Sequence, residues 1–250
     1  MNRREYLVAL AGVASLAGCS GGDGGAEGDG GSDGGGQAAS PEQSTPEPTS
    51  EPTPEPTETA TPTPVPEPDP VEFSGQGQSV TDGFHVEGGF TVFEMEHSGR
   101  SNFQVELVHG RTGDTVEYLA NEIGSWQARY PMYVESGGYV LDVNADGPWS
   151  ITVRQPRLSE DDVVSFPISA AGRYPDYIGP IHFQGLVRIG ADYNGDSNFA
   201  AWVLGTAGGE AELLFNEIGA FEGETTFGAD GYGWIRVEAT GPWGLAVQEP

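Results

Sequence analysis

The chain has 250 residues, 38 of them acidic and 10 basic, and a formal net charge of −28. All ten basic residues are arginine, and so acidic a chain excludes nucleic acid as a partner, because phosphate binding requires clustered Lys and Arg. A single cysteine excludes a disulfide framework and a cysteine-rich zinc site.

Residues 1–18 are typical of a cleaved export signal. Arg3 and Arg4 precede an apolar run over residues 6–17, which is shorter than the roughly 20 residues of a membrane-spanning helix. The paired arginines resemble a twin-arginine signal, and Leu16-Ala17-Gly18-Cys19 resembles a lipobox. We predict that cleavage leaves Cys19 lipidated, which anchors the protein to the extracellular face of the cell membrane. The alternative is a short buried helix with a chance core cysteine.

Residues 19–70 have the composition of a disordered stalk. Residues 20–39 are nearly all Gly, Asp, Ser and Ala, and residues 40–70 contain 11 of the 19 prolines of the chain, in Pro-Glu-Pro-Thr repeats. Such a segment cannot bury a core and favours extended polyproline II at ~3.1 Å per residue. We therefore expect the folded part to stand well clear of the membrane.

The remainder of the chain contains an internal repeat. Three motifs return in the same order with nearly constant spacing: Ser101-Asn102-Phe103 as Ser197-Asn198-Phe199, Asn121-Glu122-Ile123-Gly124 as Asn216-Glu217-Ile218-Gly219, and Gly147-Pro148-Trp149 as Gly241-Pro242-Trp243. This order indicates duplication. We predict one domain over residues 71–156, a linker over 157–165 and a second domain over 166–250.

Both repeats alternate apolar and polar residues with the period of a half-buried β-strand. Residues 139–143 and 149–153 show the alternation in the first repeat, and residues 243–247 show it in the second. Ser98-Gly99 and Asn194-Gly195 suit hairpin turns. The predicted fold is all-β, with two tandem small antiparallel β-sandwich or jelly-roll-like domains after the disordered stalk.

These features together resemble a group of uncharacterised surface lipoproteins of salt-loving archaea. The resemblance covers the Arg3-Arg4 signal, the lipobox, the Pro-Glu-Thr stalk and the acidic, lysine-free body, and the repeat resembles a small β-sandwich module of prokaryotic envelope proteins. It implies a fold and a location but no catalytic residues. The residues after the stalk include 26 acids against 8 arginines, which suits a protein whose self-repulsion is screened by brine.

Four repeated residues are candidates for structural anchors. Trp149 and Trp243 follow Gly-Pro and open alternating strands, so we interpret them as core residues. We also expect Ile123 and Ile218 to be buried, with the neighbouring Asn and Gly forming a bend or bulge.

Candidate cation ligands occur in two places. Asp192, Asn194 and Asp196 place oxygen atoms at alternate positions, as Ca²⁺ sites do, although the Gly and Glu of an EF-hand are missing; the alternative is a polar turn. Glu122 and Glu217 are either solvated turn carboxylates or ligands of a metal or a sugar.

Several aromatic residues alternate against the inferred core face. Trp126, Trp202 and Trp234 lead this set, which also includes Tyr130, Tyr133 and Tyr232. Exposed rings on a sandwich can stack on sugars or anchor a protein partner. Packing between the two repeats is an equally good explanation of the same residues.

The chain contains no recognisable catalytic motif. It has no Gly-X-Ser-X-Gly elbow, no His-Glu-X-X-His pair and no Gly-rich loop before a helix. His85, His97 and His109 could bind zinc only if the fold brought their strands together. We predict no cofactor and no enzymatic activity; a metal-dependent or hydrolytic enzyme is the less favoured interpretation.

The predicted function is that of a lipid-anchored cell-surface protein. Its tandem β-sandwich modules would serve binding or envelope interaction. The expected partners are the membrane, through the lipid on Cys19, and an envelope glycan or a surface protein. The alternative is a purely structural spacer of the envelope with no discrete ligand.

Overall fold

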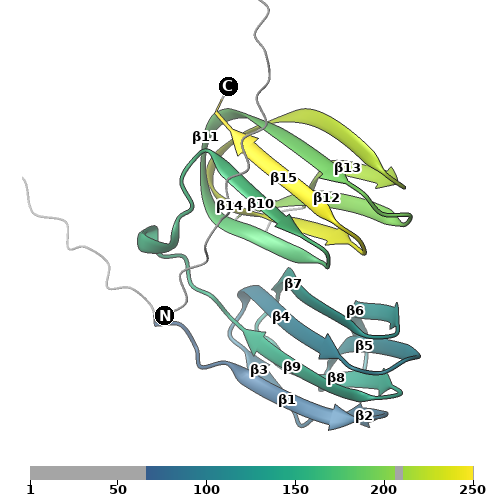
Figure 1. The fold of residues 1–250 in the computed structure, drawn as a ribbon. Coiled ribbons are helices and arrows are strands. Elements are labelled where there is room, and N and C mark those ends of the chain that lie inside the picture. The colour runs from purple at the N-terminus through teal and green to yellow at the C-terminus, as the bar shows by residue number, and fades with distance from the viewer. Residues whose placement is uncertain (1–65, 206–210, 250) are drawn as a thin grey trace, which may run out of the picture. The chain divides into compact units, whose positions relative to one another are not determined.

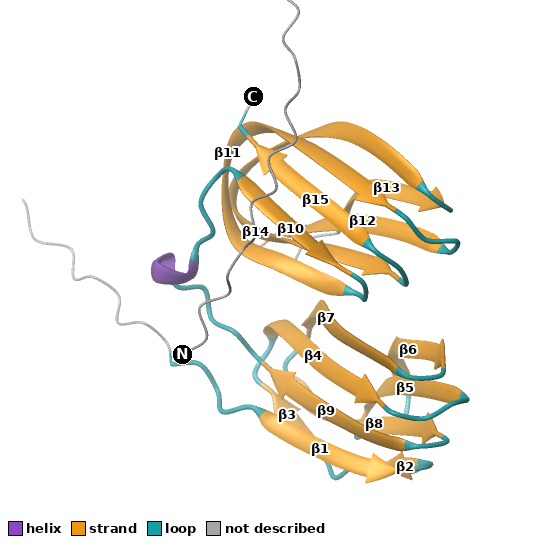
Figure 2. Cartoon of the chain, viewed as in Figure 1, coloured by secondary structure: helices purple, strands orange, loops and turns teal. Residues whose placement is uncertain are grey.

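The computed structural model describes residues 66–205 and 211–249 (Figure 1). The predicted export signal with Arg3 and Arg4, the predicted lipidation site Cys19 and the predicted stalk up to residue 65 lie outside the described residues. Strands make up almost all regular structure within them, and the exception is one 3-10 turn, η1 (Glu160–Asp162) (Figure 2). The predicted all-β antiparallel class is confirmed. Among the described residues, no helix has the length and apolar character needed to cross a membrane.

Residues 71–154 form the two sheets of the first half. The first sheet has the order β1 (Val71–Gln76), β9 (Pro148–Arg154), β4 (Gly89–His97), β7 (Trp126–Val134). The second has the order β2 (Ser79–Val80), β8 (Gly137–Ala145), β5 (Asn102–His109), β6 (Thr115–Ile123), and β3 (Phe84–Val86) also pairs with β8. The core draws on both sheets, for example Phe93 and Met95 from β4 and Val105 and Leu107 from β5. This arrangement is the expected sandwich.

Residues 168–248 form the six-stranded sheet of the second half. Its order is β10 (Ile168–Gly172), β15 (Trp243–Gln248), β11 (Asp176–Tyr193), β14 (Phe221–Ala239), β12 (Asn198–Gly205), β13 (Glu212–Ile218). Strands β11 and β14 are long and curved (Figure 1). In the first half, β3 and β4 together correspond to β11, and β7 and β8 together correspond to β14. In the first half the chain is interrupted between β3 and β4 at Gly88 and Gly89, whose φ values of 95° and 110° suit only glycine.

The repeated motifs occupy the same registers in both halves. Trp149 of β9 lies opposite Gly75 of β1, and Trp243 of β15 lies opposite Gly172 of β10. A Cβ at either glycine would come within 2.5 Å of the indole ring. Each tryptophan ring therefore lies in the core over a glycine of the adjacent strand, where the missing side chain leaves room for the ring.

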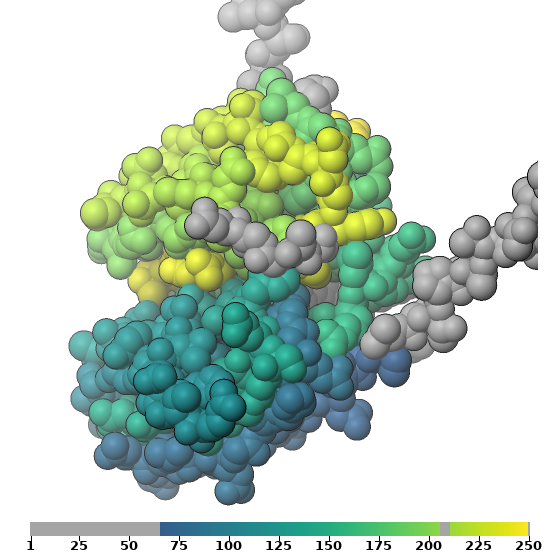
Figure 3. Space-filling view, turned by 180° about the vertical axis from the view of Figure 1, so that it is seen from behind, coloured from purple at the N-terminus to yellow at the C-terminus, as the bar shows by residue number. Residues whose placement is uncertain are grey.

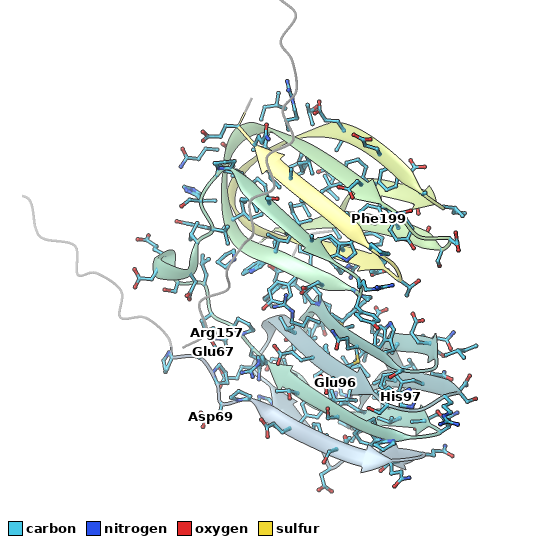
Figure 4. All side chains as sticks on the ribbon, in the orientation of Figure 1. Glu67, Asp69, Glu96, His97, Arg157 and Phe199 are labelled. Atoms are coloured by element: carbon cyan, nitrogen blue, oxygen red, sulfur yellow. The ribbon has the colours of Figure 1, made fainter. Side chains whose placement is uncertain are left out.

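The phenylalanine of each Ser-Asn-Phe motif packs on an aromatic ring at the end of the strand that precedes it in the chain. The ring of His97 stacks on Phe103 with centroids 4.6 Å apart, and Tyr193 packs on Phe199 with centroids 5.5 Å apart. Figure 4 shows His97 and Phe199 within their respective halves. The buried His97 therefore belongs to a packed core and does not meet His85 and His109 in a shared site.

The prediction that Ile123 and Ile218 are buried is wrong. They are 81% and 85% exposed, at the ends of the edge strands β6 and β13. Glu122 pairs with the fully buried Phe103, so the carboxylate is on the core-facing side of the sheet. Because side chains alternate along a strand, the isoleucine that follows must face solvent.

The predicted hairpin turns are instead crossings between strands that do not pair. The turn at Ser98-Gly99 joins β4 to β5, which belong to different sheets. The turn at Asn194-Gly195 joins β11 to β12, which are not neighbours in the sheet. Gly147 lies so near Gly99 that a Cβ there would be 2.6 Å from its Cα. The connection at Gly99 and the connection at Gly147 thus approach each other so closely that only glycine fits at these two positions.

Candidate functional site

The described residues of both halves belong to one compact unit, and a third, smaller core joins them. It consists of Phe90 and Val92 from β4 with Leu204 from β12 and Trp234 from β14, all buried. Trp234 is 4% exposed, so the prediction of a solvent-facing ligand platform at this residue is wrong. Its burial instead fits the alternative, packing between the repeats.

Polar contacts flank this small core. The backbone N–H of Arg129 donates to the carbonyl of Pro175 at 3.0 Å, which covers part of the free edge of β7. The guanidinium of Arg129 also forms an ion pair with Asp176 and lies over the ring of Tyr177. Burial raises the pKa of the Asp176 carboxyl, and the adjacent guanidinium opposes that rise.

Two adjoining hollows beside this junction share four residues and form one groove, which we call the inter-half groove. The hollows measure about 540 and 530 Å³, within the range of small-molecule sites. The shared residues are Asn121, Glu122, Trp126 and Thr240. The first hollow is completed by Ile123, Ser125, Arg173, Tyr174 and Gly241. The second is completed by Glu117, Tyr118, Leu119, Ala120, Tyr130, Pro175, Ser197, Asn198, Glu238 and Ala239.

Trp126 is the buried aromatic residue of the groove. As the first residue of β7 it pairs with the core residue His97, so its side chain faces inward and is only 7% exposed. The prediction of an exposed ring at Trp126 is therefore wrong. Its indole N–H, however, has no hydrogen-bond partner among the described residues. An unpaired buried donor costs about 1–3 kcal/mol, so this one calls for an explanation.

Carboxylates supply most of the charge of the groove. Burial raises the pKa of Glu122, which the register of β6 turns toward the core side. Burial also raises the pKa of Glu238; Arg236 opposes this rise, with its Nε 3.2 Å from the Glu238 Oε1, and Glu117 adds to it. Both carboxyl groups are therefore partly withdrawn from water and lack full compensation.

The guanidinium beside Glu238 is already engaged. Arg236 donates to the hydroxyl of Tyr130 at 3.3 Å and lies over the rings of Tyr130 and Trp202, 5.2 and 4.5 Å from their centroids. Burial raises the pKa of the Tyr130 phenol far above its usual range, so this hydroxyl stays protonated. Trp202 is half-buried under Arg236, which makes it part of this cation–π arrangement.

The repeated Asn-Glu-Ile-Gly motif contributes to the groove from its first copy. The groove lining includes Asn121 and Glu122 but neither Asn216 nor Glu217. Phe221 is the counterpart of Trp126 in the second repeat, because Phe221 pairs with Tyr193 as Trp126 pairs with His97. The second repeat therefore has a ring without an N–H donor at this position. The donor and the nearby carboxylates are thus combined only in the first copy.

A third hollow, of about 500 Å³, lies along β4, β7 and β9. Its lining includes Glu94, Glu96 and Gln127 and also the ion pair of Arg129 with Asp176. The strands place Glu94 opposite Arg129 and Glu96 opposite Gln127. Arg129 and Asp176 compensate each other's charge in this hollow, although the Arg129 Nη1 has no hydrogen-bond partner among the described residues.

The remaining predicted ligands do not converge on a site. Asp192 lies on β11, and Asn194 and Asp196 lie on the turn that follows; all three are exposed. His85 and His109 line a separate hollow of about 720 Å³ at β3, β5 and β8. Within residues 66–205 and 211–249, no three His, Cys, Asp or Glu side chains are grouped so as to hold a metal ion. The Ca²⁺ site at Asp192 therefore stays a prediction.

Sequence reasoning named Glu122 but not Glu238, Glu117 or Tyr118. Glu117, Tyr118 and Glu122 all lie on β6, and Glu238 of β14 joins them only through contact between the halves. Figure 3 shows the surface of the described residues from behind, with the first half in blue to teal and the second in green to yellow. The sequence signal nearest to this site is the repeated Asn-Glu-Ile-Gly motif, which contributes Glu122 to the groove.

Comparison with known proteins identifies no family. No family model matches the chain, and no curated protein matches its sequence. Similar solved structures include the PBSX exported protein XepA, at 10% identity over 71% of this chain and 86% of that chain with a TM-score of 0.23. A fucolectin from striped bass (Morone saxatilis) serum matches at 8% identity over 70% and 84%, with a TM-score of 0.21. A conserved protein of unknown function from Pseudomonas aeruginosa PAO1 matches at 10% identity over 72% and 80%, with a TM-score of 0.20. Likenesses this weak carry no argument about function.

Proposed function

We propose that this protein is a lipid-anchored binding protein of the cell surface, which takes its ligand in the inter-half groove. The observation that carries the proposal is the groove itself, two adjoining hollows of about 540 and 530 Å³ that share Glu122, the second of which is also lined by Glu238 and by the exposed ring of Tyr118. Partly buried carboxyl groups and an exposed tyrosine ring provide hydrogen-bonding and packing partners for a ligand.

Anchoring through Cys19 is the second part of the proposal. It rests on the sequence, since Leu16-Ala17-Gly18-Cys19 resembles a lipobox and a long Pro-rich segment follows. We expect Cys19→Ser to release the protein into the medium, because the serine cannot take the thioether-linked lipid. Fractionation of cultures checks this, and a Cys19→Ser protein that stays with the membrane would contradict the anchor.

Binding is tested by capture from an envelope extract at the salt concentration of the source cells. The bait is the released Cys19→Ser chain, compared with the same chain carrying Tyr118→Ala, which removes an exposed ring of the groove. We expect envelope material on the first bait and much less on the second. Equal capture by both baits would remove the groove from the proposal. Beads that carry nothing in either case would favour the purely structural role.

A second candidate function is hydrolysis of a glycosidic bond. It is favoured by Glu122 and Glu238, two carboxyls with raised pKa values in one hollow, as a general acid requires. Release of reducing ends from captured glycan would support it. Capture without any release would leave binding as the function.

A further inference from the structure

The inter-half groove runs along a free sheet edge, and this edge indicates what kind of ligand the groove takes. We infer that the ligand is an extended peptide segment of another protein, which adds as a strand beside β6 and brings a basic side chain into the groove. This partner rests on the proposed function, because it occupies the same groove.

The groove meets β6 along its edge. Six consecutive residues of this strand, from Glu117 to Glu122, line one hollow. Successive side chains of a strand point to opposite faces, so a wall made of consecutive residues is an edge and not one face of the sheet. β6 is the last strand of its sheet and pairs with β5 alone. The hollow therefore lies where a further strand of this sheet would be added.

The main chain of β6 has free donors and acceptors on this edge. The Gly124 N–H donates to the Ser101 carbonyl at 2.7 Å, which marks these two residues as a hydrogen-bonded pair at the end of the β5–β6 ladder. Such pairs alternate along an antiparallel ladder, so the N–H and C=O groups of Glu122 point toward β5 and those of Asn121 and Ile123 point away from it. Among the described residues, β6 makes no main-chain hydrogen bond outside this ladder. An added strand would pair with Asn121 and Ile123.

The edge of the other sheet is covered by contrast. β7 ends that sheet, and its Arg129 N–H donates to the carbonyl of Pro175 from the second half. An uncovered edge is a template for another strand, and addition of an extended peptide to such an edge is a common form of peptide recognition. β6 offers this template and β7 does not.

Exposed apolar side chains accompany the free edge. Tyr118 and Ile123 of β6 are exposed, and so are Leu213 and Ile218 at the matching positions of β13. Many natural edge strands carry charged side chains that prevent pairing with other chains. The apolar pair on β6 instead offers packing surface to the side chains of an added strand. β13 has a similar edge but lines neither hollow of the groove, which makes it a matched control.

The charge of the groove favours a basic segment. The lining contains Glu117, Glu122 and Glu238 but one arginine, Arg173. Glu238 is paired with Arg236, whereas Glu117 and Glu122 form no ion pair among the described residues. An arginine or lysine of the added strand would compensate them. A second copy of this chain, pairing through its own β6, would instead bring like charges together, which is destabilising.

The test is the binding of short fluorescent peptides to the full Cys19→Ser chain at molar salt, followed by anisotropy. The probes alternate Val or Thr with Arg. One control set has Glu in place of Arg, and another carries N-methyl groups that remove main-chain donors. We expect the Arg peptides to bind severalfold more tightly than the Glu peptides and at least tenfold more tightly than the N-methylated ones. Glu122→Gln should weaken their binding severalfold, and Glu217→Gln, outside the groove, should leave it unchanged.

A proline substitution at Asn121 tests the edge itself. The N–H of Asn121 points away from β5, so Asn121→Pro removes an outward donor and leaves the β5–β6 ladder intact, as proline does at sheet edges. It should weaken peptide binding at least tenfold, whereas Asn121→Thr keeps the donor and should retain most of the binding. Asn216→Pro makes the same change in β13 and should have no effect on binding. Thermal melts verify that each variant folds.

Each contrary result has a distinct meaning. Equal binding of the Arg peptides by the Asn121→Pro variant would overturn strand addition, and preference for the Glu peptides would overturn the basic partner. Self-association that Asn121→Pro abolishes, measured by sedimentation, would show that a second copy takes the edge and would overturn the foreign partner. If no peptide binds and envelope capture still depends on Tyr118, the peptide ligand is refuted and the proposed function stands.

Discussion

The ring of Phe90 in the first half stacks on the indole of Trp234 in the second, with centroids 3.9 Å apart and planes 11° from parallel. Tyr133 and Tyr177 meet the same phenylalanine edge-on. This aromatic cluster lies outside the two larger cores, so its role is to join the halves. The inter-half groove exists only where this junction holds.

Phe90→Ala should therefore destabilise the junction. Loss of a buried phenylalanine side chain costs about 3–5 kcal/mol, and here the loss falls on contacts between the halves. Urea unfolding at molar salt, followed by tryptophan fluorescence, measures the effect. Leu186 is the matching residue of the second half and provides the control. It comes just before β11 begins to pair with β15, as Phe90 comes just before β4 begins to pair with β9. Its side chain, however, is 52% exposed. Leu186→Ala should cost about 0.5 kcal/mol or less. Equal losses in the two variants would show that the stack does not join the halves.

The packing of the two repeated tryptophans predicts that a side chain added at the facing glycine destabilises the fold. Trp149 and Trp243 donate their indole N–H to main-chain carbonyls, each at 3.0 Å, while covering Gly75 and Gly172. Gly75→Ala should lower the free energy of unfolding by about 1–3 kcal/mol, because the added methyl group overlaps the ring of Trp149.

A glycine with open space above it provides the comparison. Gly190 lies in β11, and a Cβ built there meets nothing within 4 Å. Gly190→Ala should be neutral or stabilising, because alanine restricts the unfolded chain more than glycine does. Urea midpoints of the two variants decide the matter, and a Gly75→Ala protein as stable as Gly190→Ala would refute the close packing.

Sequence patterns predicted the strands well where one face is buried. The alternation over residues 149–153 corresponds to β9, with Trp149, Ile151 and Val153 buried as its inward set. The pattern was misleading at strand ends. At the end of β6 the charged Glu122 faces inward and Ile123 outward, because the register set by Phe103 outweighs the hydrophobic preference of the two side chains.

Contacts between distant segments could not be predicted from the sequence. A Gly-containing turn has the same sequence pattern whether it closes a hairpin or connects two strands that do not pair, so the pattern alone does not distinguish the connections at Gly99 and Gly195 from hairpins. Trp234 likewise gave no sign that its partner would be Phe90, far away in the chain. The groove combines strands of both halves, and periodicity within a strand carries no information about such contacts.

The buried carboxyls predict that stability depends on pH. Burial raises the pKa values of Glu122 and Glu238 above those of the unfolded chain, so the folded state holds more protons between the two values. Stability should consequently rise as pH falls from 7 toward about 4.3, the usual pKa of an unfolded glutamate. Melting temperatures between pH 7 and pH 5 at molar salt check this.

Glu122→Gln separates the role of this carboxyl in stability from its role in binding. The amide has no charge to desolvate, so the variant should melt slightly higher at pH 7 and show a weaker pH dependence. Glu217→Gln, at an exposed position of the same motif, should change neither. A lower melting temperature for Glu122→Gln at pH 7 would show that the carboxylate stabilises the free protein.

The central claim is that a ligand binds in the inter-half groove, and the indole resonance of Trp126, which lines both hollows, tests that most directly. The chain has five tryptophans, and Trp126→Phe identifies the indole N–H signal of this one in a proton–nitrogen spectrum. Addition of the envelope extract at molar salt should move that signal, because a ligand in the groove changes the surroundings of the ring. The signals of Trp149 and Trp243, whose indole N–H groups are bonded to carbonyls outside the groove, should stay in place. A Trp126 signal that the extract does not move would contradict the account.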